Sequence, residues 1–225
     1  MSTQQQTKQF KAALFDLDGV IVDTARYHFL AWGQIAQQEG IPFDEHVNER
    51  LKGVSRMASL DIILEQGKRP YSDAEKLALA EKKNNSYVEM IGTLKPAEIL
   101  PGVKAFLTDL RYAGIKTSIC SASKNAVMIL ERLQLMPYFD TIVSGNDTTR
   151  SKPDPQVFQI AADRFGLAGS ECLVFEDAFA GIEGAKAAGM LAVGIGEADV
   201  LHNADLVYTG TALLSLDDIR QKLYA

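Results

Sequence analysis

The 225-residue chain is poor in cysteine, in tryptophan and in positive charge. Its two cysteines, Cys120 and Cys172, are not spaced like a zinc site or a redox pair, so both are predicted to be buried, reduced thiols. No apolar run approaches the roughly 18 residues of a membrane-spanning helix. The glutamine-rich start lacks the apolar segment of a signal peptide. We therefore expect a cytoplasmic protein with no membrane partner and a disordered N-terminus over residues 1–9.

The charge balance is mildly acidic, with 23 Lys and Arg against 29 Asp and Glu and a net charge of −6. Nucleic acids demand a basic surface, so we expect no nucleic-acid partner. A small phosphorylated ligand remains compatible, because a few local cations can outweigh a weak global field. The length allows one large domain, or one domain with a smaller insert.

Two patterns of apolar residues divide the chain. Residues 11–16 predict a buried strand, and helical periodicity follows at 25–39, 55–66 and 72–91. After Pro101 helix and strand patterns alternate, with strands expected at 115–119, 141–143, 172–175, 191–195 and 205–208 and helices at 102–113, 124–134, 155–165, 179–188 and 215–223. Alternation of this kind is typical of an α/β fold with a doubly wound parallel sheet. We predict such a core from residues 10–21 and 96–225, interrupted by an inserted α-helical cap over residues 22–95.

The stretch FDLDGV at residues 15–20 ends the first strand with two carboxylates one residue apart. At 4 Å two like charges repel by roughly 4 kcal/mol at an effective dielectric near 20, so something must offset them. Ligands of doubly wound sheets bind beyond the carboxyl ends of the strands. Polar side chains follow four of the expected strands there: Asp16 and Asp18, Ser121, Lys152, Glu176 and Asp177.

Oxygen ligands of this kind select Mg²⁺, which usually completes its shell with water and phosphate oxygens. The predicted metal-binding residues are Asp16, Asp18, Glu176 and Asp177. An ionised Asp16 could act as a nucleophile that forms an aspartyl phosphate. If the extended path continues, Asp18 faces the same side and can move the proton of the leaving or attacking oxygen. Lys152 and Ser121 suit the phosphoryl group itself.

Four segments, DLDGV at 16–20, SAS at 121–123, KP at 152–153 and ED at 176–177, resemble the ordered motifs of the haloacid dehalogenase superfamily. The helical insert resembles the first cap class of that superfamily. Further segments resemble its phosphosugar mutases: residues 23–29, Trp32, 51–56, 83–84 and 121–125. The similarity runs from about residue 10 to 196 and is weakest in 66–76 and in the last thirty residues.

The resemblance implies interconversion of β-D-glucose 1-phosphate and glucose 6-phosphate through bound β-D-glucose 1,6-bisphosphate, with Mg²⁺ as cofactor. It implies that Asp16 is the phosphorylated nucleophile and Asp18 the general acid and base. Asp16, the backbone carbonyl of Asp18 and Asp177 would then bind the metal, with Glu176 beside them. Ser121 and Lys152 would hold the transferring phosphate.

The resemblance also assigns roles in the cap and in the loop after the second strand. Arg56 would bind the distal phosphate, with Lys124 and Asn125 supporting that end or the sugar. Thr24 and His28 would link cap closure to the position of Asp18. The other residues expected to bind substrate are Trp32, Gly53, Val54, Ser55, Lys83, Ala122 and Ser123.

Other interpretations stay open at this point. A hydrolase of the same fold would release phosphate from a sugar phosphate or phosphoglycolate, and a non-catalytic module would only bind phosphosugars. A mutase must hold two phosphates, which favours cations on both sides of the sugar, Lys152 in the core and Arg56 in the cap. Arg56 could instead face water, Lys83 could belong to a solvated charge run, and Trp32 could be cap core. We expect a monomer.

Overall fold

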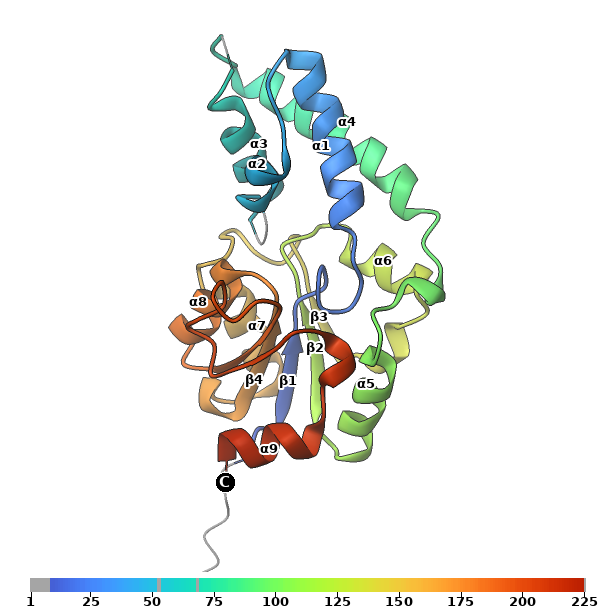
Figure 1. Cartoon of the computed structure of the whole chain (residues 1–225), viewed down its shortest axis with the longest axis vertical. Coiled ribbons are helices and arrows are strands. Elements are labelled where there is room, and N and C mark those ends of the chain that lie inside the picture. Colours follow the sequence, from blue (N-terminus) through green and yellow to red (C-terminus); the bar gives the residue numbers. More distant parts are fainter. Residues whose placement is uncertain (1–8, 52–53, 68, 225) are drawn as a thin grey trace, which may run out of the picture.

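The computed structural model describes residues 9–51, 54–67 and 69–224. Figure 1 shows two layers, a sheet flanked by helices and a group of helices beyond one end of that sheet. Gly53 and residues 1–8 of the expected disordered start lie outside the described residues.

The described residues contain a six-stranded sheet in the order β3-β2-β1-β4-β5-β6, with parallel pairing throughout. This confirms the doubly wound α/β prediction. The order places β1 between β2 and β4, where Phe15 lies opposite Ile119 and Phe175. The strands are β1 (Ala12–Phe15), β2 (Lys116–Cys120), β3 (Thr141–Val143), β4 (Cys172–Glu176), β5 (Leu191–Ile195) and β6 (Leu206–Tyr208).

Alternate residues of β1 enter different hydrophobic clusters, as the period of a strand requires. Phe15 joins a cluster with Phe106 and stacks on Phe175 at 4.6 Å between ring centroids, whereas Leu14 joins Phe158 on the opposite face. Both faces are therefore buried, which explains the continuous apolar run of this strand. The helices of this layer are α5 (Val103–Tyr112), α6 (Ala126–Arg132), α7 (Gln156–Phe165), α8 (Phe179–Ala187) and α9 (Leu216–Tyr224). Short 3₁₀ turns occur at Pro96–Glu98, Met136–Tyr138, Gly169–Glu171 and Thr211–Leu213.

The second layer consists, within the described residues, of α1 (Ala25–Glu39), α2 (Glu45–Glu49), α3 (Arg56–Leu64) and α4 (Asp73–Ile91). These helices enclose a hydrophobic cluster of their own that includes Trp32, Ile35, Leu60, Ile63 and Leu79. A capping box between Ser72 and Glu75 starts α4. We refer to α1–α4 as the cap.

Two linkers join the cap to the sheet and run side by side. Val22 and Ile99 form an antiparallel bridge, and the amide of Leu100 donates to the carbonyl of Ile21 at 3.0 Å. The predicted domain boundaries at residues 22 and 95 fall in or next to these linkers and remain our proposed division of the chain.

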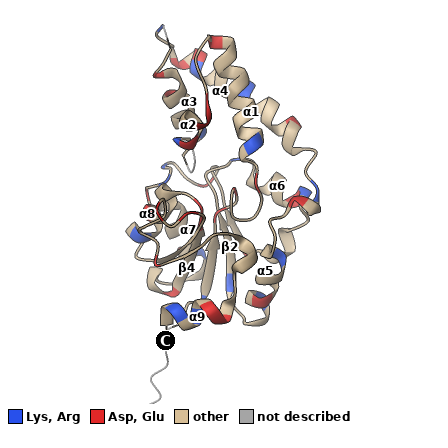
Figure 2. Cartoon of the chain, in the orientation of Figure 1, with Lys and Arg blue, Asp and Glu red and all other residues tan. Residues whose placement is uncertain are grey.

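No helix in the described part of the chain is long and apolar enough to cross a membrane. Figure 2 shows Lys and Arg interspersed with Asp and Glu over both layers. Cys120 and Cys172 are buried and unpaired, as predicted.

Candidate active site

Three carboxylates meet where β1 and β4 end. The amide of Asp16 donates to the carbonyl of Phe175 at 2.9 Å, which extends the pairing of the strands by one residue and fixes Asp16 beside β4. Glu176 ends β4, and Asp177 follows it. Asp16, Glu176 and Asp177 each offer an oxygen within 4.8 Å of the others. The order of the strands thus brings Asp16 together with two acids that follow it by 160 residues or more in the sequence.

Lys152 is the cation of this cluster and is itself buried. Its Nζ donates to Asp16 Oδ1 at 2.5 Å and to Glu176 Oε2 at 2.7 Å. Burial alone would lower the pKa of Lys152, but the carboxylates of Asp16 and Glu176 outweigh it and raise that pKa. Lys152 is therefore an ammonium that can stay beside a phosphoryl group.

Three acids and one ammonium meet at this point. Burial raises the pKa of Glu176 well above its usual value, although the charge of Lys152 opposes that shift. A divalent cation would favour the ionised carboxylates, whose oxygens are hard ligands, so Asp16, Glu176 and Asp177 fit an ion such as Mg²⁺. Gly19 packs against this group with φ of +78°, and a Cβ on it would lie 2.1 Å from Asp177 Oδ2. Only glycine leaves the Asp177 carboxylate its place there.

The Asp18 carboxylate turns away from the three-acid group and toward the cap. It accepts a hydrogen bond from Thr24 Oγ1, and that hydroxyl lies 3.1 Å from the hydroxyl of Tyr87. Burial, and secondly the charge of Asp16, raise the pKa of Asp18 to about 7. A carboxyl with that pKa can both give and take a proton near neutral pH. The expected metal contact through the Asp18 carbonyl remains a prediction.

A cleft of about 1210 Å³ separates the edge of the sheet from the cap. Most of the predicted substrate-binding residues line it, from both layers. Those on its wall are His28, Trp32, Val54, Ser55, Arg56, Lys83, Ser121, Ala122, Ser123, Lys124 and Asn125, together with Asp16, Asp18 and Asp177. Thr24, Lys152 and Glu176 are buried behind this wall.

Lys83 lies on the inner face of the cap, so its interpretation as part of a solvated charge run is wrong. Its Nζ is 3.0 Å from His28 Nδ1 and 4.9 Å from the centroid of the Trp32 ring. Burial, followed by the charge of Arg56, lowers the pKa of Lys83 to about 7. Burial also keeps the pKa of His28 well below its usual value, which leaves that imidazole neutral. Trp32 serves both suggested roles, because it packs in the cap cluster and lines the cleft.

The loop after β2 is fixed by its own hydroxyls. Ser121 Oγ accepts from the Ser123 amide at 3.1 Å, and Ser123 Oγ accepts from the Asn125 amide at 3.2 Å. Asn125 then reaches the cap, where its side-chain amide donates to Asn84 Oδ1 at 2.9 Å. Across the cleft the half-buried Arg56 begins α3, and Ser55 caps that helix by accepting from the Ala58 amide at 3.3 Å.

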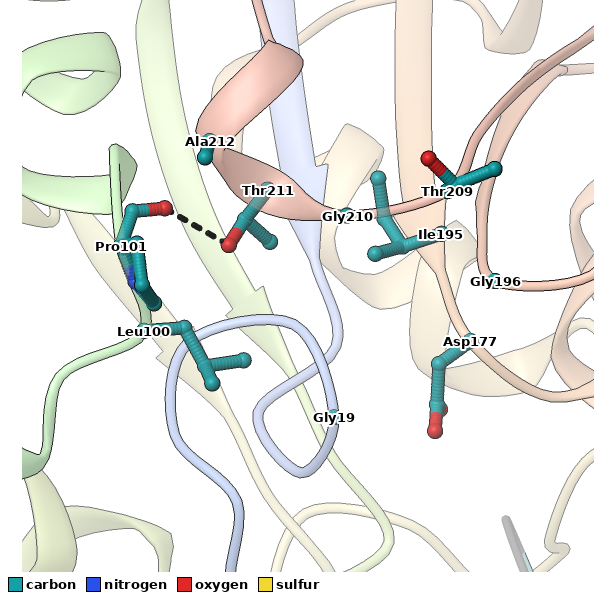
Figure 3. A pocket seen from close by; sticks show the side chains of 10 residues that line it. All are labelled: Gly19, Leu100, Pro101, Asp177, Ile195, Gly196, Thr209, Gly210, Thr211 and Ala212. Carbon is teal, nitrogen blue, oxygen red and sulfur yellow. Dashed lines mark hydrogen bonds between the residues drawn. The ribbon is translucent and has the colours of Figure 1, made fainter.

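Sequence reasoning missed two features of this region. Tyr87 was not predicted, although it lies four residues after Lys83 on the same face of α4, a spacing that could have pointed to it. A second cavity, of about 330 Å³, lies beside Gly19 and Asp177 (Figure 3). The segment Thr209–Ala212 covers its other side, and Thr211 Oγ1 donates to the carbonyl of Pro101 at 2.8 Å.

The profile of the haloacid dehalogenase-like hydrolases matches residues 10–189. The chain belongs to this family. The family that was predicted from the order and strand context of four motifs is thereby confirmed.

Within the haloacid dehalogenase-like family the chain is similar to phosphoglucomutases. It is 45% identical over 214 residues to β-phosphoglucomutase of Bacillus subtilis, covering 94% of this chain and 95% of that protein. The crystal structure of a β-phosphoglucomutase from Clostridium difficile superposes with a TM-score of 0.92 at 41% identity, covering 95% and 97% of the two chains. The phosphorylated carbohydrates phosphatase of Thermotoga maritima is 31% identical over 183 residues, 80% of this chain and 82% of that one. The predicted likeness to phosphosugar mutases is confirmed.

Proposed function

We propose that this protein is an intramolecular phosphotransferase that interconverts β-D-glucose 1-phosphate and D-glucose 6-phosphate through β-D-glucose 1,6-bisphosphate. The similarity to β-phosphoglucomutases over almost the whole chain supports the proposal. One observation carries it: a cation stands on each side of the cleft, Lys152 behind the core wall and Arg56 on the cap wall. A phosphatase needs to hold one phosphate, whereas a mutase holds two at once.

In the first transfer an oxygen of Asp16 attacks phosphorus, and the bond from phosphorus to the sugar oxygen breaks. Asp18 gives its proton to that leaving oxygen, for which its pKa of about 7 is suited. Lys152 and Ser121 hold the oxygens of the transferring group. The product of this step is an aspartyl phosphate on Asp16.

In the second transfer a hydroxyl of the sugar attacks that phosphorus, and Asp16 leaves as a carboxylate. Asp18 now takes the proton of the attacking hydroxyl. Arg56, with Lys124 and Asn125, would hold the phosphate that is not transferred in each step. Between the two transfers the bisphosphate turns around, so that its two phosphates exchange places. Closure of the cap over the cleft would exclude water, so the aspartyl phosphate waits for a sugar hydroxyl.

Mg²⁺ would be held by Asp16 and Asp177 and by the carbonyl of Asp18, with Glu176 beside them. When bound, it supplies positive charge that offsets the phosphoryl oxygens and the carboxylates. A cytoplasmic location and a monomeric state complete the proposal, and both derive from the sequence alone.

The test supplies β-D-glucose 1-phosphate with a trace of the 1,6-bisphosphate and follows glucose 6-phosphate and free phosphate together. We expect glucose 6-phosphate to dominate and the Asp16→Asn variant to form neither product. Dominant release of phosphate would contradict the mutase and establish a hydrolase instead. Unchanged turnover by Asp16→Asn would leave only a binding module.

A sugar-phosphate phosphatase is the second candidate, favoured by the similarity to the Thermotoga maritima enzyme. The same assay separates the two, because a phosphatase would release phosphate whether or not the bisphosphate is added. A panel of other hexose 1-phosphates would then measure how strictly the cleft selects glucose.

A further inference from the structure

Three hydroxyl and carboxyl groups form a chain from the cap to the catalytic loop. Tyr87 belongs to α4, Thr24 to the first linker and Asp18 to the loop after β1. The Thr24 hydroxyl has one proton and donates it to Asp18 Oδ1. The contact of 3.1 Å between Thr24 Oγ1 and the Tyr87 hydroxyl must therefore have Tyr87 as its donor. While Oδ1 is the unprotonated oxygen of Asp18, donation thus runs from Tyr87 through Thr24 to Asp18.

The surroundings of Tyr87 keep it in this role. Its side chain is 1% exposed and Thr24 is 0% exposed, so water does not compete for the contact. The centroid of the Tyr87 ring lies 4.1 Å from the centroid of the His28 ring and 4.4 Å from Lys83 Nζ. Burial, and secondly the charge of Asp18, raise the pKa of Tyr87 well above its usual value, which keeps the phenol protonated as a donor.

We propose that Tyr87 is a positioning residue for the general acid and base, setting through Thr24 the direction in which the Asp18 carboxyl points. This inference rests on the proposed function. Because Tyr87 belongs to the cap and Asp18 to the core, the chain of hydrogen bonds ties the Asp18 carboxyl to the cap through Thr24. The side chains of Lys83 and His28 contact the ring of Tyr87, whereas the Thr24 hydroxyl bonds Asp18 and lies against the Tyr87 hydroxyl.

The proposal has a kinetic signature that a general loss of structure would not give. Phosphorylation of Asp16 by the 1,6-bisphosphate expels a sugar alkoxide, which needs a proton from Asp18 as it leaves. Phosphorylation of Asp16 by acetyl phosphate expels acetate, a stable anion that needs none. A residue that positions Asp18 matters for the first donor and not for the second.

The experiment compares the rate of phosphoenzyme formation from these two donors by rapid quench and intact mass. In Tyr87→Phe we expect the rate with the bisphosphate to fall about tenfold, a fraction of the effect of losing an acid catalyst outright. The rate with acetyl phosphate should stay within a factor of about two, since that step needs no acid. Tyr27→Phe is the matched control, because it removes a phenol that bonds Glu98 and lies on the neighbouring helix α1. It should leave both rates unchanged.

A double-mutant cycle checks that Tyr87 acts through Thr24. Thr24→Val breaks the chain in the middle and should give the same selective loss, and it serves as the test if Tyr87→Phe proves unstable. Adding Tyr87→Phe to Thr24→Val should cost nothing more, because the two changes interrupt one path. Independent, multiplying losses would overturn the proposal.

The outcomes also separate this inference from the proposed function. Wild-type protein that is phosphorylated by neither donor would refute the proposed function itself. Normal phosphorylation of the wild type, with equal losses for both donors or no loss in Tyr87→Phe, would refute only the role of Tyr87.

Discussion

Gly181 is the residue that allows Glu176 to reach the active site. It lies in the first turn of α8, and the carboxyl of Glu176 passes directly against it on the way to Lys152. A Cβ on Gly181 would lie 2.0 Å from Glu176 Cδ and 2.2 Å from its Oε2. The sequence alone does not mark this glycine as a site residue, because its role depends on a neighbour that only the fold supplies.

Gly181→Ala should therefore damage both stability and catalysis. The added methyl group must push Glu176 aside, and overpacking of this kind costs about 1–3 kcal/mol of unfolding free energy. Turnover of β-D-glucose 1-phosphate should fall more than tenfold, because the contact between Glu176 and Lys152 is lost. This factor corresponds to the free energy of one hydrogen bond between charged groups, about 1.5–3 kcal/mol. Urea unfolding and the mutase assay measure the two effects.

Gly33→Ala is the control for that variant. Gly33 also lies in a helix, α1, but a Cβ there would meet its nearest neighbour, Phe43 Cδ1, at 3.7 Å. It should leave turnover unchanged and stabilise the helix slightly. A Gly181→Ala enzyme as active and stable as Gly33→Ala would show that Glu176 is not held against α8.

At the scale of single residues, the sequence predicted which acidic residues lie together but not the direction in which each side chain points. Asp16, Glu176 and Asp177 could be placed because each follows a buried strand, and strand ends share an edge. The same-face argument for Asp18 assumed that the extended path continues past Phe15. The strand stops there, and Gly19 takes a positive φ of +78°, so alternation no longer fixes the direction of Asp18. Its bond to Thr24 is a tertiary contact that no local pattern encodes.

Among the elements, α3 brings a cation to the far side of the cleft. Arg56 is its first residue, and the Ser55 cap fixes where the helix begins. Because Arg56 is half-buried and lines the cleft, its guanidinium stays near the substrate rather than extending into solvent.

Arg56→Ala should weaken the binding of sugar phosphates that reach both sides of the cleft, and should not affect small phosphoryl donors. Loss of a charged hydrogen bond to phosphate costs about 1.5–3 kcal/mol, or roughly 10- to 100-fold in KM for β-D-glucose 1-phosphate. Phosphorylation by acetyl phosphate should hardly change, since that donor has no second phosphate to bind. Steady-state kinetics with both donors measure this.

Arg50→Ala is the matched control in the cap. Arg50 pairs with Glu65 at 2.7 Å and is not among the residues of the cleft wall, so its loss should leave KM unchanged. Equal losses for both donors in Arg56→Ala would contradict the role of Arg56 as an anchor for the distal phosphate.

The long helices followed from their periodicity and the strands from their apolar runs, but the five-residue helix α2 did not. The expected helix at 25–39 coincides with α1, and the strands at 141–143 and 191–195 coincide with β3 and β5. Helix α2 was missed because its five residues are too few to show a helical period.

At the scale of the whole molecule, a chain with net charge −6 gathers three of its acids at one point. Asp16, Glu176 and Asp177 repel one another, and Lys152 offsets only part of that repulsion. A divalent cation should thus raise the global stability of the protein and not only its activity.

Removal of magnesium with a chelator should lower the Tm. A cation whose free concentration is 100 times its Kd stabilises the folded state by about 2.7 kcal/mol. In a chain of this size that free energy corresponds to a shift of a few degrees in Tm. The Tm of Asp177→Asn should respond much less to magnesium, because one of the predicted metal ligands is gone. Scanning calorimetry at constant ionic strength makes the measurement. A magnesium effect of equal size in Asp177→Asn would contradict the predicted metal site.

At this largest scale the sequence predicted that a helical insert exists, but not where it rests. The position of the cap over the sheet depends on contacts between segments far apart in the chain, such as Asn84 with Asn125 and Tyr87 with Thr24. Periodicity describes each helix alone, so it contains no information on these pairs. The volume of the cleft was unpredictable for the same reason.

The two linkers give the molecule a further property. The cap leaves and rejoins the core through one crossing, where Val22 pairs with Ile99 and Ile21 with Leu100. A segment whose two ends emerge together can be exchanged without opening the fold beneath it. Transplanting the cap of a relative between these two points would swap the sugar-facing wall while the phosphoryl chemistry of the sheet edge stays in place. Selectivity for the sugar would thus depend on the cap and reactivity on the sheet, which are two separable segments of one chain.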